Sequence, residues 1–147
     1  MHGSVAGLAV AALLTSCGGT GLTTVPSGTP AGSPGTPVAV TLREFTVDAN
    51  PNTVAAGPVT FQIANSGAIE HSFVVVGPTG LGADGLPSDD GGQTVDVEEV
   101  GEKGEVGAIA AGSSATLNAT LAAGNYVLIC NIASHYSAGM RVALTVH

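Results

Sequence analysis

The amino-acid sequence predicts an all-β domain, and three observations support that prediction. Short segments from residue 38 onward alternate apolar and polar residues, as half-buried strands do. Turn signals rich in Gly and Pro separate these segments in a chain that holds 22 Gly and 8 Pro. No window of about 11 residues in this region keeps the 3.6-residue apolar period of a helix. The expected fold is therefore an antiparallel β-sandwich or barrel with little helix.

The predicted strands follow one another along one domain, residues 38–147. The segments with the alternating pattern are 38–42, 45–47, 59–63, 72–76, 115–121, 126–130 and 140–146. Turns are indicated at residues 50–52, 56–58 and 124–125, where Asn, Gly and Pro cluster. A region of this length can bury one hydrophobic core without disulfides.

The first 37 residues have a different composition. No charged residue precedes Arg43, and the apolar run Val5–Leu14 is shorter than the about 20 residues that a membrane-spanning helix needs. The run fits the apolar part of a signal peptide over residues 1–16. Leu-Thr-Ser-Cys, ending at Cys17, resembles the bacterial lipobox and implies lipid attachment to Cys17 after export. Residues 17–37, rich in Gly, Pro, Ser and Thr, are then expected to form a flexible tether.

Two alternatives remain open for Cys17. It can be a spare thiol, or it can pair with Cys130 in a disulfide, since exported cysteines often do. If the lipid is attached, the domain lies on the outer side of the cytoplasmic membrane or in the periplasm and touches the membrane only through its anchor.

Negative charge is concentrated in one stretch of the chain. The net charge is −8, and eight of the 11 acidic residues lie between Asp84 and Glu105. This stretch belongs to an acidic insertion of about residues 77–105, which is open to three interpretations: a solvated excursion, a docking surface for a basic partner, or a weak cation site with oxygen ligands. The net charge also argues against a nucleic-acid partner, which would require a basic surface.

Four residues form a candidate metal site. Cys130, His135 and Met140 follow the pattern Cys-x4-His-x4-Met around the last strand pair, and His71 begins an earlier strand. A thiolate, two imidazoles and a weak thioether are the ligands of a trigonal copper site with a long axial bond. Each residue alone has an ordinary explanation, with Cys130 and Met140 as core residues and the histidines as surface or hydrogen-bonded side chains. Together they favour copper.

The segment from Gly124 to Met140 resembles the corresponding part of small bacterial cupredoxins. These are blue, type 1 copper proteins such as auracyanin, rusticyanin and sulfocyanin, and the similarity covers about residues 38–146. It implies a Greek-key β-sandwich that binds one copper, Cu(I) or Cu(II), with His71, Cys130 and His135 as equatorial ligands and Met140 as the axial ligand.

The same resemblance suggests residues around the ligands. Ser72 stands where the family often has Asn or Ser, whose hydrogen bonds tie the two ligand loops together. Asn131 is a second candidate for a role of this kind. In the family one ring edge of the C-terminal-loop histidine lies near the surface within an apolar patch, so His135 is the expected point of electron entry and exit.

The implied function is single-electron transfer between extracytoplasmic redox proteins such as cytochromes or terminal oxidases, by a monomer without enzyme activity. Copper trafficking or storage is the main alternative, although it favours clusters of exposed Met and His, and the chain has only two Met. A copper enzyme would require further His ligands. A cysteine hydrolase built on Cys130 and His135 would leave Met140 without a role.

Overall fold

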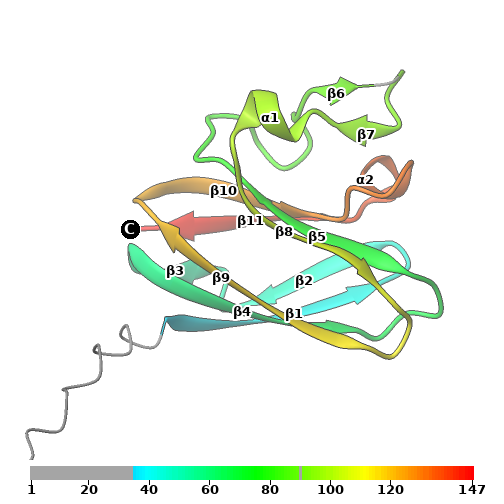
Figure 1. The fold of residues 1–147 in the computed structure, drawn as a ribbon. Helices are drawn as coiled ribbons and strands as arrows, with labels where there is room; N and C mark the ends of the chain where they lie inside the picture. Colours follow the sequence, from blue (N-terminus) through cyan, green and yellow to red (C-terminus); the bar gives the residue numbers. More distant parts are fainter. Residues whose placement is uncertain (1–34, 90) are drawn as a thin grey trace, which may run out of the picture. The chain divides into compact units, whose positions relative to one another are not determined.

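A computed structural model describes residues 35–89 and 91–147. The predicted signal peptide, Cys17 and most of the predicted tether lie outside the described residues. The described residues form two sheets that pack as a β-sandwich, in which strands adjacent within a sheet are often distant in the sequence (Figure 1). The all-β, Greek-key prediction is therefore confirmed. In this part of the chain, no helix has the length and apolar character needed to cross a membrane.

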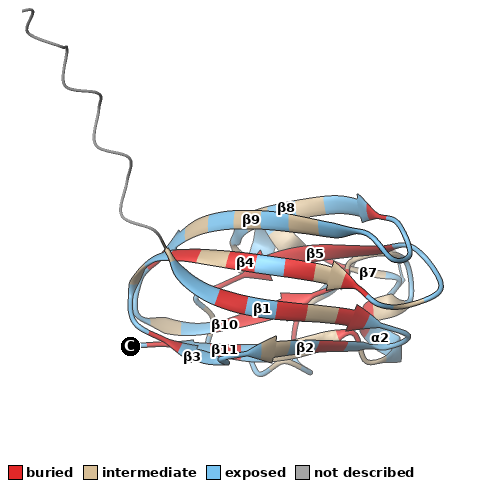
Figure 2. Cartoon of the chain, turned by 90° about the horizontal axis from the view of Figure 1, so that it is seen from below, coloured by how far each residue is buried: buried red, intermediate tan, exposed pale blue. Residues whose placement is uncertain are grey.

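The first sheet contains four strands in the order β2-β1-β4-β9. Their bounds are β1 Thr36–Arg43, β2 Thr46–Asn50, β4 Gly57–Asn65 and β9 Ser114–Leu121. Buried and exposed residues alternate along β1 and β4, as the sequence pattern predicts (Figure 2). β1 pairs with β4 in parallel, with Val38 opposite Phe61. The expectation of a wholly antiparallel sandwich is wrong at this pair, because β1 and β4 are joined through other strands and not by a hairpin.

The second sheet contains five strands in the order β3-β11-β10-β5-β8. Their bounds are β3 Thr53–Val54, β5 His71–Val76, β8 Glu102–Ile109, β10 Gly124–Ile129 and β11 Arg141–Val146. β3 and β11 form a second parallel pair. Every residue of β5 and the last four of β10 are buried. Both strands lie in the middle of the sheet, and burial on both faces accounts for their continuous apolar runs.

The acidic stretch supplies the cover on the outer face of this second sheet. It folds into a small hairpin and a one-turn helix, with bounds β6 Ser88–Asp89, β7 Thr94–Val95 and α1 Val97–Val100 (Figure 1). Its apolar residues Leu86 and Val95 are buried in one cluster with Val76 and Val127 of the sheet. Because β8 begins at Glu102, only residues 77–101 of the predicted insertion lie outside the two sheets.

The main core lies between the two sheets. Phe61 of the first sheet contacts Phe73 of the second, with ring centroids 5.3 Å apart. Cys130 and Met140 belong to the same core and are fully buried. Two of the four candidate ligands are therefore fixed by the packing of the sandwich itself.

Candidate metal centre

Two neighbouring strands bring the first two candidate ligands together. His71 is the first residue of β5, and Cys130 directly follows the last residue of β10. These strands are antiparallel, with Val74 opposite Ile129, so the start of one lies beside the end of the other. Their side chains thus meet at one end of the sandwich, although they are 59 positions apart in the sequence.

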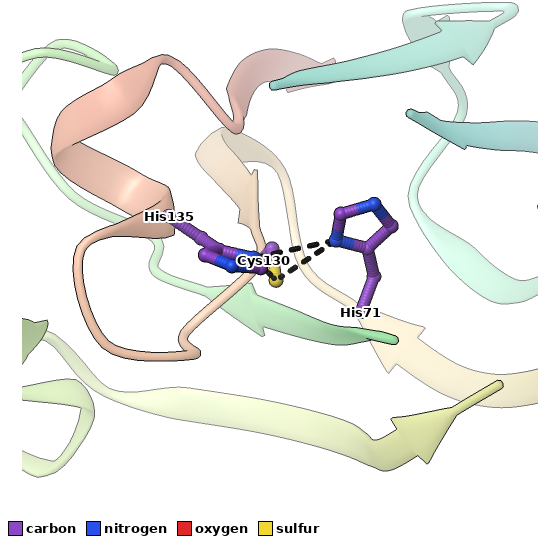
Figure 3. A group of neighbouring side chains, drawn as sticks. All are labelled: His71, Cys130 and His135. Carbon is purple, nitrogen blue, oxygen red and sulfur yellow. Dashed lines mark hydrogen bonds between the residues drawn. The ribbon is translucent and has the colours of Figure 1, made fainter. Parts of the chain in front are cut away.

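The third candidate ligand completes a compact group. Nδ1 of His135 lies 3.4 Å from Sγ of Cys130 and 3.3 Å from Nδ1 of His71, and Nδ1 of His71 lies 4.0 Å from the same sulfur (Figure 3). One donor atom from each residue falls within 4.8 Å of the others. His71 and Cys130 are fully buried, whereas His135 is half-buried. The structure therefore brings together His71, Cys130 and His135, three of the four ligands predicted from sequence.

A short loop places His135 and Met140. His135 begins the one-turn helix α2, His135–Ala138, and the main-chain N–H of Met140 donates to the His135 carbonyl at 3.1 Å. The N–H of Cys130 donates to the Met140 carbonyl at 3.1 Å, which closes the loop at its base. Gly139 has a φ of 126°, and a Cβ there would lie 3.0 Å from the Phe45 carbonyl oxygen. This position therefore requires glycine.

The chemistry of these donors fits copper. Burial, followed by the nearby His71, lowers the pKa of His135, which favours the neutral imidazole that binds metals. A thiol sulfur suits Cu(I), and imidazole nitrogen suits both copper states. The buried sulfur also has a shielded environment that excludes competing water. Two nitrogens and a sulfur held in this way match the equatorial ligands of a type 1 site.

Ser72 links the two ligand segments. Its main-chain N–H donates to Sγ of Cys130 at 3.2 Å, and its hydroxyl oxygen lies 3.6 Å from the same sulfur. That hydroxyl accepts the main-chain N–H of Asn131 at 2.9 Å. Hydrogen bonds to a ligating sulfur reduce its electron donation to a metal and therefore tune the potential of the site.

Asn131 contacts the acidic stretch instead of the donor atoms. Its side chain accepts the N–H of Val95 at 2.7 Å and donates to the Val95 carbonyl at 3.1 Å. The side chain therefore fastens the start of the ligand loop to β7. Sequence reasoning placed Asn131 near the site, but the partner on β7 was not foreseeable from spacing.

The ligand loop has further attachments to the acidic insertion. The Tyr136 hydroxyl donates to the Ala83 carbonyl at 2.6 Å. Arg141, which follows Met140, donates from Nε to Oδ1 of Asp84 at 2.6 Å. Together with Asn131, these contacts hold both ends and the middle of the loop, so the acidic stretch buttresses the candidate site.

Glu44 is a neighbour of the cluster that the sequence did not indicate. Its Oε1 lies 3.5 Å from Nε2 of His71 and accepts the N–H groups of Ala68 and Ile69 at 2.7 and 2.9 Å. These main-chain hydrogen bonds, that from Ile69 foremost, lower the pKa of Glu44. No sequence signal marks this residue, because it lies in the turn between β1 and β2, far from the ligand motifs.

Comparison with known proteins places this arrangement among described families. The family described as "Sulfocyanin (SoxE) domain" matches residues 52–147. No curated protein matches the chain.

Solved structures share the fold. Dithionite-reduced auracyanin from the photosynthetic bacterium Roseiflexus castenholzii is 24% identical, with a TM-score of 0.59 over 78% of this chain and 98% of its own. Auracyanin B is 21% identical, with a TM-score of 0.59 over 78% of this chain and 91% of its own. A rusticyanin variant is 20% identical, with a TM-score of 0.51 over 77% of this chain and 79% of its own.

Proposed function

The chain belongs to the sulfocyanin family, and on that premise we propose that it is a type 1 copper protein that carries single electrons between extracytoplasmic redox proteins. One observation carries the proposal: Nδ1 of His71, Nδ1 of His135 and Sγ of Cys130 converge within 4.8 Å at one end of the sandwich. This is the donor set that the family cofactor, one type 1 copper, requires.

We assign His71, Cys130 and His135 as equatorial ligands and Met140 as the axial ligand. The assignment of Met140 is supported by its complete burial in the core that holds Cys130 and by its main-chain hydrogen bonds to Cys130 and His135. Bound copper would supply one-electron exchange between Cu(I) and Cu(II). The residues around it keep the donors in place in both states, which lowers the cost of reorganisation.

His135 is the proposed point of electron entry and exit. It is the half-buried member of an otherwise buried group. Small residues flank it in the loop, with Ala133 and Ala138 exposed. Phe45, a residue that is 41% exposed, packs edge-on against the His135 ring, with ring centroids 5.2 Å apart. An apolar, closely packed surface lets a redox partner approach without bringing water to the donors.

We also propose export and a lipid anchor at Cys17, from the signal-like sequence that precedes the domain. The electron partners would then be extracytoplasmic redox proteins such as cytochromes or terminal oxidases, met by a monomer near the membrane. The proposed role needs no substrate site, because a centre with four protein ligands has no open position for a substrate.

Copper retention distinguishes the carrier from the alternative, copper trafficking or storage. The copper-loaded protein is cycled with a mild reductant and oxidant in the presence of a competing Cu(I) chelator. A carrier keeps its copper through repeated cycles, because buried donors hold both states. Transfer of copper to the chelator upon reduction would instead support trafficking.

Replacing Met140 with leucine tests the axial ligand. Leucine has a similar volume but no donor atom, so copper stays bound by the three equatorial residues while Cu(II) loses stabilisation. We expect the equilibrium constant for reduction to rise roughly tenfold, a shift of about 59 mV upward for one electron. Potentiometric titration of the visible absorption measures this shift. Loss of copper binding would show that Met140 is not a weak axial ligand.

A further inference from the structure

The buried ring of His71 has one nitrogen that the proposed site does not use. Its Nδ1 faces Cys130 and His135, whereas its Nε2 is buried and makes no hydrogen bond within the described part of the chain. When a metal occupies Nδ1 of a neutral imidazole, the proton is on Nε2. A buried N–H without an acceptor is costly, and histidine ligands almost always donate this proton to a carboxylate, a carbonyl or water.

Glu44 is positioned to be that acceptor. Its Oε1 lies 3.5 Å from Nε2 of His71, and its side chain is 31% exposed. A small movement of the ring or the carboxylate brings this separation into the hydrogen-bond range of about 2.7–3.2 Å. This hydrogen bond would give Nε2 of His71 a partner. Among the described residues, Nε2 is the one buried side-chain nitrogen or oxygen that makes no hydrogen bond.

Main-chain groups between β4 and β5 hold the carboxylate in place. The N–H groups of Ala68 and Ile69 both donate to the oxygen that faces His71. Gly67 lies against it, because a Cβ at this position would come within 2.5 Å of Oε1 and 2.9 Å of Oε2. The connection between β4 and β5 therefore holds the Glu44 carboxylate closely, by hydrogen bonds and by the close approach of Gly67, next to the histidine that begins β5.

We propose, on the basis of the copper site proposed above, that Glu44 is a positioning residue that accepts the Nε2–H hydrogen bond of His71 and lowers the reduction potential of the centre. The bond fixes the ring orientation and the tautomer that leaves Nδ1 free for the metal. The negative charge increases the donor strength of the imidazole and favours Cu(II), which carries one more positive charge than Cu(I).

A purely structural role for Glu44 makes a different prediction. The two hydrogen bonds from Ala68 and Ile69 stabilise the connection between β4 and β5, whether or not a metal is bound. If this were the only role, changes at Glu44 would lower the thermal stability and leave the reduction potential unchanged.

The test compares Glu44→Gln with Glu70→Gln in the copper-loaded protein. Glutamine keeps an oxygen that can accept from Ala68 and Ile69 but removes the charge. Glu70 is a matched control, because it is an exposed carboxylate directly before His71 in the sequence. We expect the equilibrium constant for reduction to rise about tenfold in Glu44→Gln, equivalent to about 59 mV, and to change less than twofold in Glu70→Gln.

Gly67→Ala supplies a variant that alters no charge. The added methyl group would occupy the position of the Glu44 carboxylate and displace the carboxylate from His71. We expect this variant to raise the potential in the same direction as Glu44→Gln. The two changes should not add in the double variant, since both remove one interaction.

Proton–nitrogen-15 correlation NMR of the diamagnetic Cu(I) protein provides a second readout. The Nε2 proton of His71 should be observed far downfield and protected from exchange in the wild type, and should move upfield in Glu44→Gln. Equal potentials in Glu44→Gln and Glu70→Gln would overturn the proposal, even if the stability changed. Failure of the wild-type protein to form a type 1 centre would overturn the proposed function instead, so the two failures are distinguishable.

Discussion

Replacing Cys130 with serine is expected to remove the intense visible colour of the Cu(II) protein. That colour arises from charge transfer between a thiolate sulfur and copper, and serine has a similar size but only a hard hydroxyl oxygen. Sγ of Cys130 lies 3.4 Å from Nδ1 of His135 and 4.0 Å from Nδ1 of His71, so the substitution removes the sulfur donor from the cluster. Copper affinity should fall by more than the roughly 10–100-fold that loss of an outer hydrogen-bond partner typically causes. Absorption spectroscopy and a competitive copper titration measure both effects.

Cys17→Ser is the matched control for this experiment. Cys130 is a buried free cysteine within the β-sandwich, whereas Cys17 precedes the domain. The control should keep full colour and affinity. A Cys130→Ser protein that remained intensely coloured would contradict the ligand assignment. Loss of colour in Cys17→Ser would show that Cys17 contributes to the copper site and has a role beyond lipid attachment.

Replacing Asn131 with alanine is expected to lower the free energy of unfolding more than any other substitution described above. The Asn131 side chain exchanges two hydrogen bonds with the main chain of Val95, a residue that is 1% exposed. Its removal leaves a buried N–H and carbonyl unpaired at about 1–3 kcal/mol each. For a domain of this size, the melting temperature should fall on the order of 10 °C. Thermal unfolding followed by circular dichroism measures the change in the protein without copper.

Asn125→Ala is the control, because Asn125 is an exposed asparagine on β10, the strand that leads into the ligand loop. Its melting temperature should stay within about 2 °C of the wild type, as surface substitutions usually change stability by less than 0.5 kcal/mol. Equal melting temperatures for the two variants would show that the contact between the ligand loop and β7 contributes nothing to stability.

The buttressing contacts change the interpretation of the acidic stretch. Most of the charged residues described in it are exposed, whereas Leu86 and Val95 pack against the second sheet, and Asp84 pairs with Arg141 beside the ligand loop. The same segment therefore presents negative charge to solvent and adds apolar residues that pack on the outer face of the second sheet. Sequence reasoning detected the charge, but two buried apolar residues in a stretch dominated by acids give no strand or helix period.

The longer strands were predictable from the sequence by one of two patterns. β1 and β4 alternate as half-buried strands should, whereas β5 and β10 were recognisable as short apolar runs between turns. β8 was not predicted, because its sequence contains two Gly, two Glu and one Lys. It is an edge strand with one neighbour, and charge on such strands discourages pairing with other molecules. The two-residue strands β3, β6 and β7 are too short to carry a period.

The sequence indicated the donors of the site and its neighbour Ser72, but not the other residues around it. The spacing of Cys130, His135 and Met140 places these residues on one loop, and the position of His71 at the start of an earlier strand made it the fourth candidate. The copper prediction is confirmed by the family to which the chain belongs. Glu44 lies in a turn and Val95 on β7, both in segments distant from the ligand motifs. Their contacts with the site depend on the packing of the whole sandwich.

A titration of the metal-free protein with Cu(II) tests the central claim most directly. We predict that one equivalent of Cu(II) produces an intense thiolate-to-copper charge-transfer band that saturates at a ratio of one. One electron equivalent of reductant should bleach this band, and reoxidation should restore it without loss of copper. Weak absorption typical of copper without a thiolate ligand, or binding of Cu(I) alone, would contradict the assignment of His71, Cys130 and His135 to an electron-carrying type 1 centre.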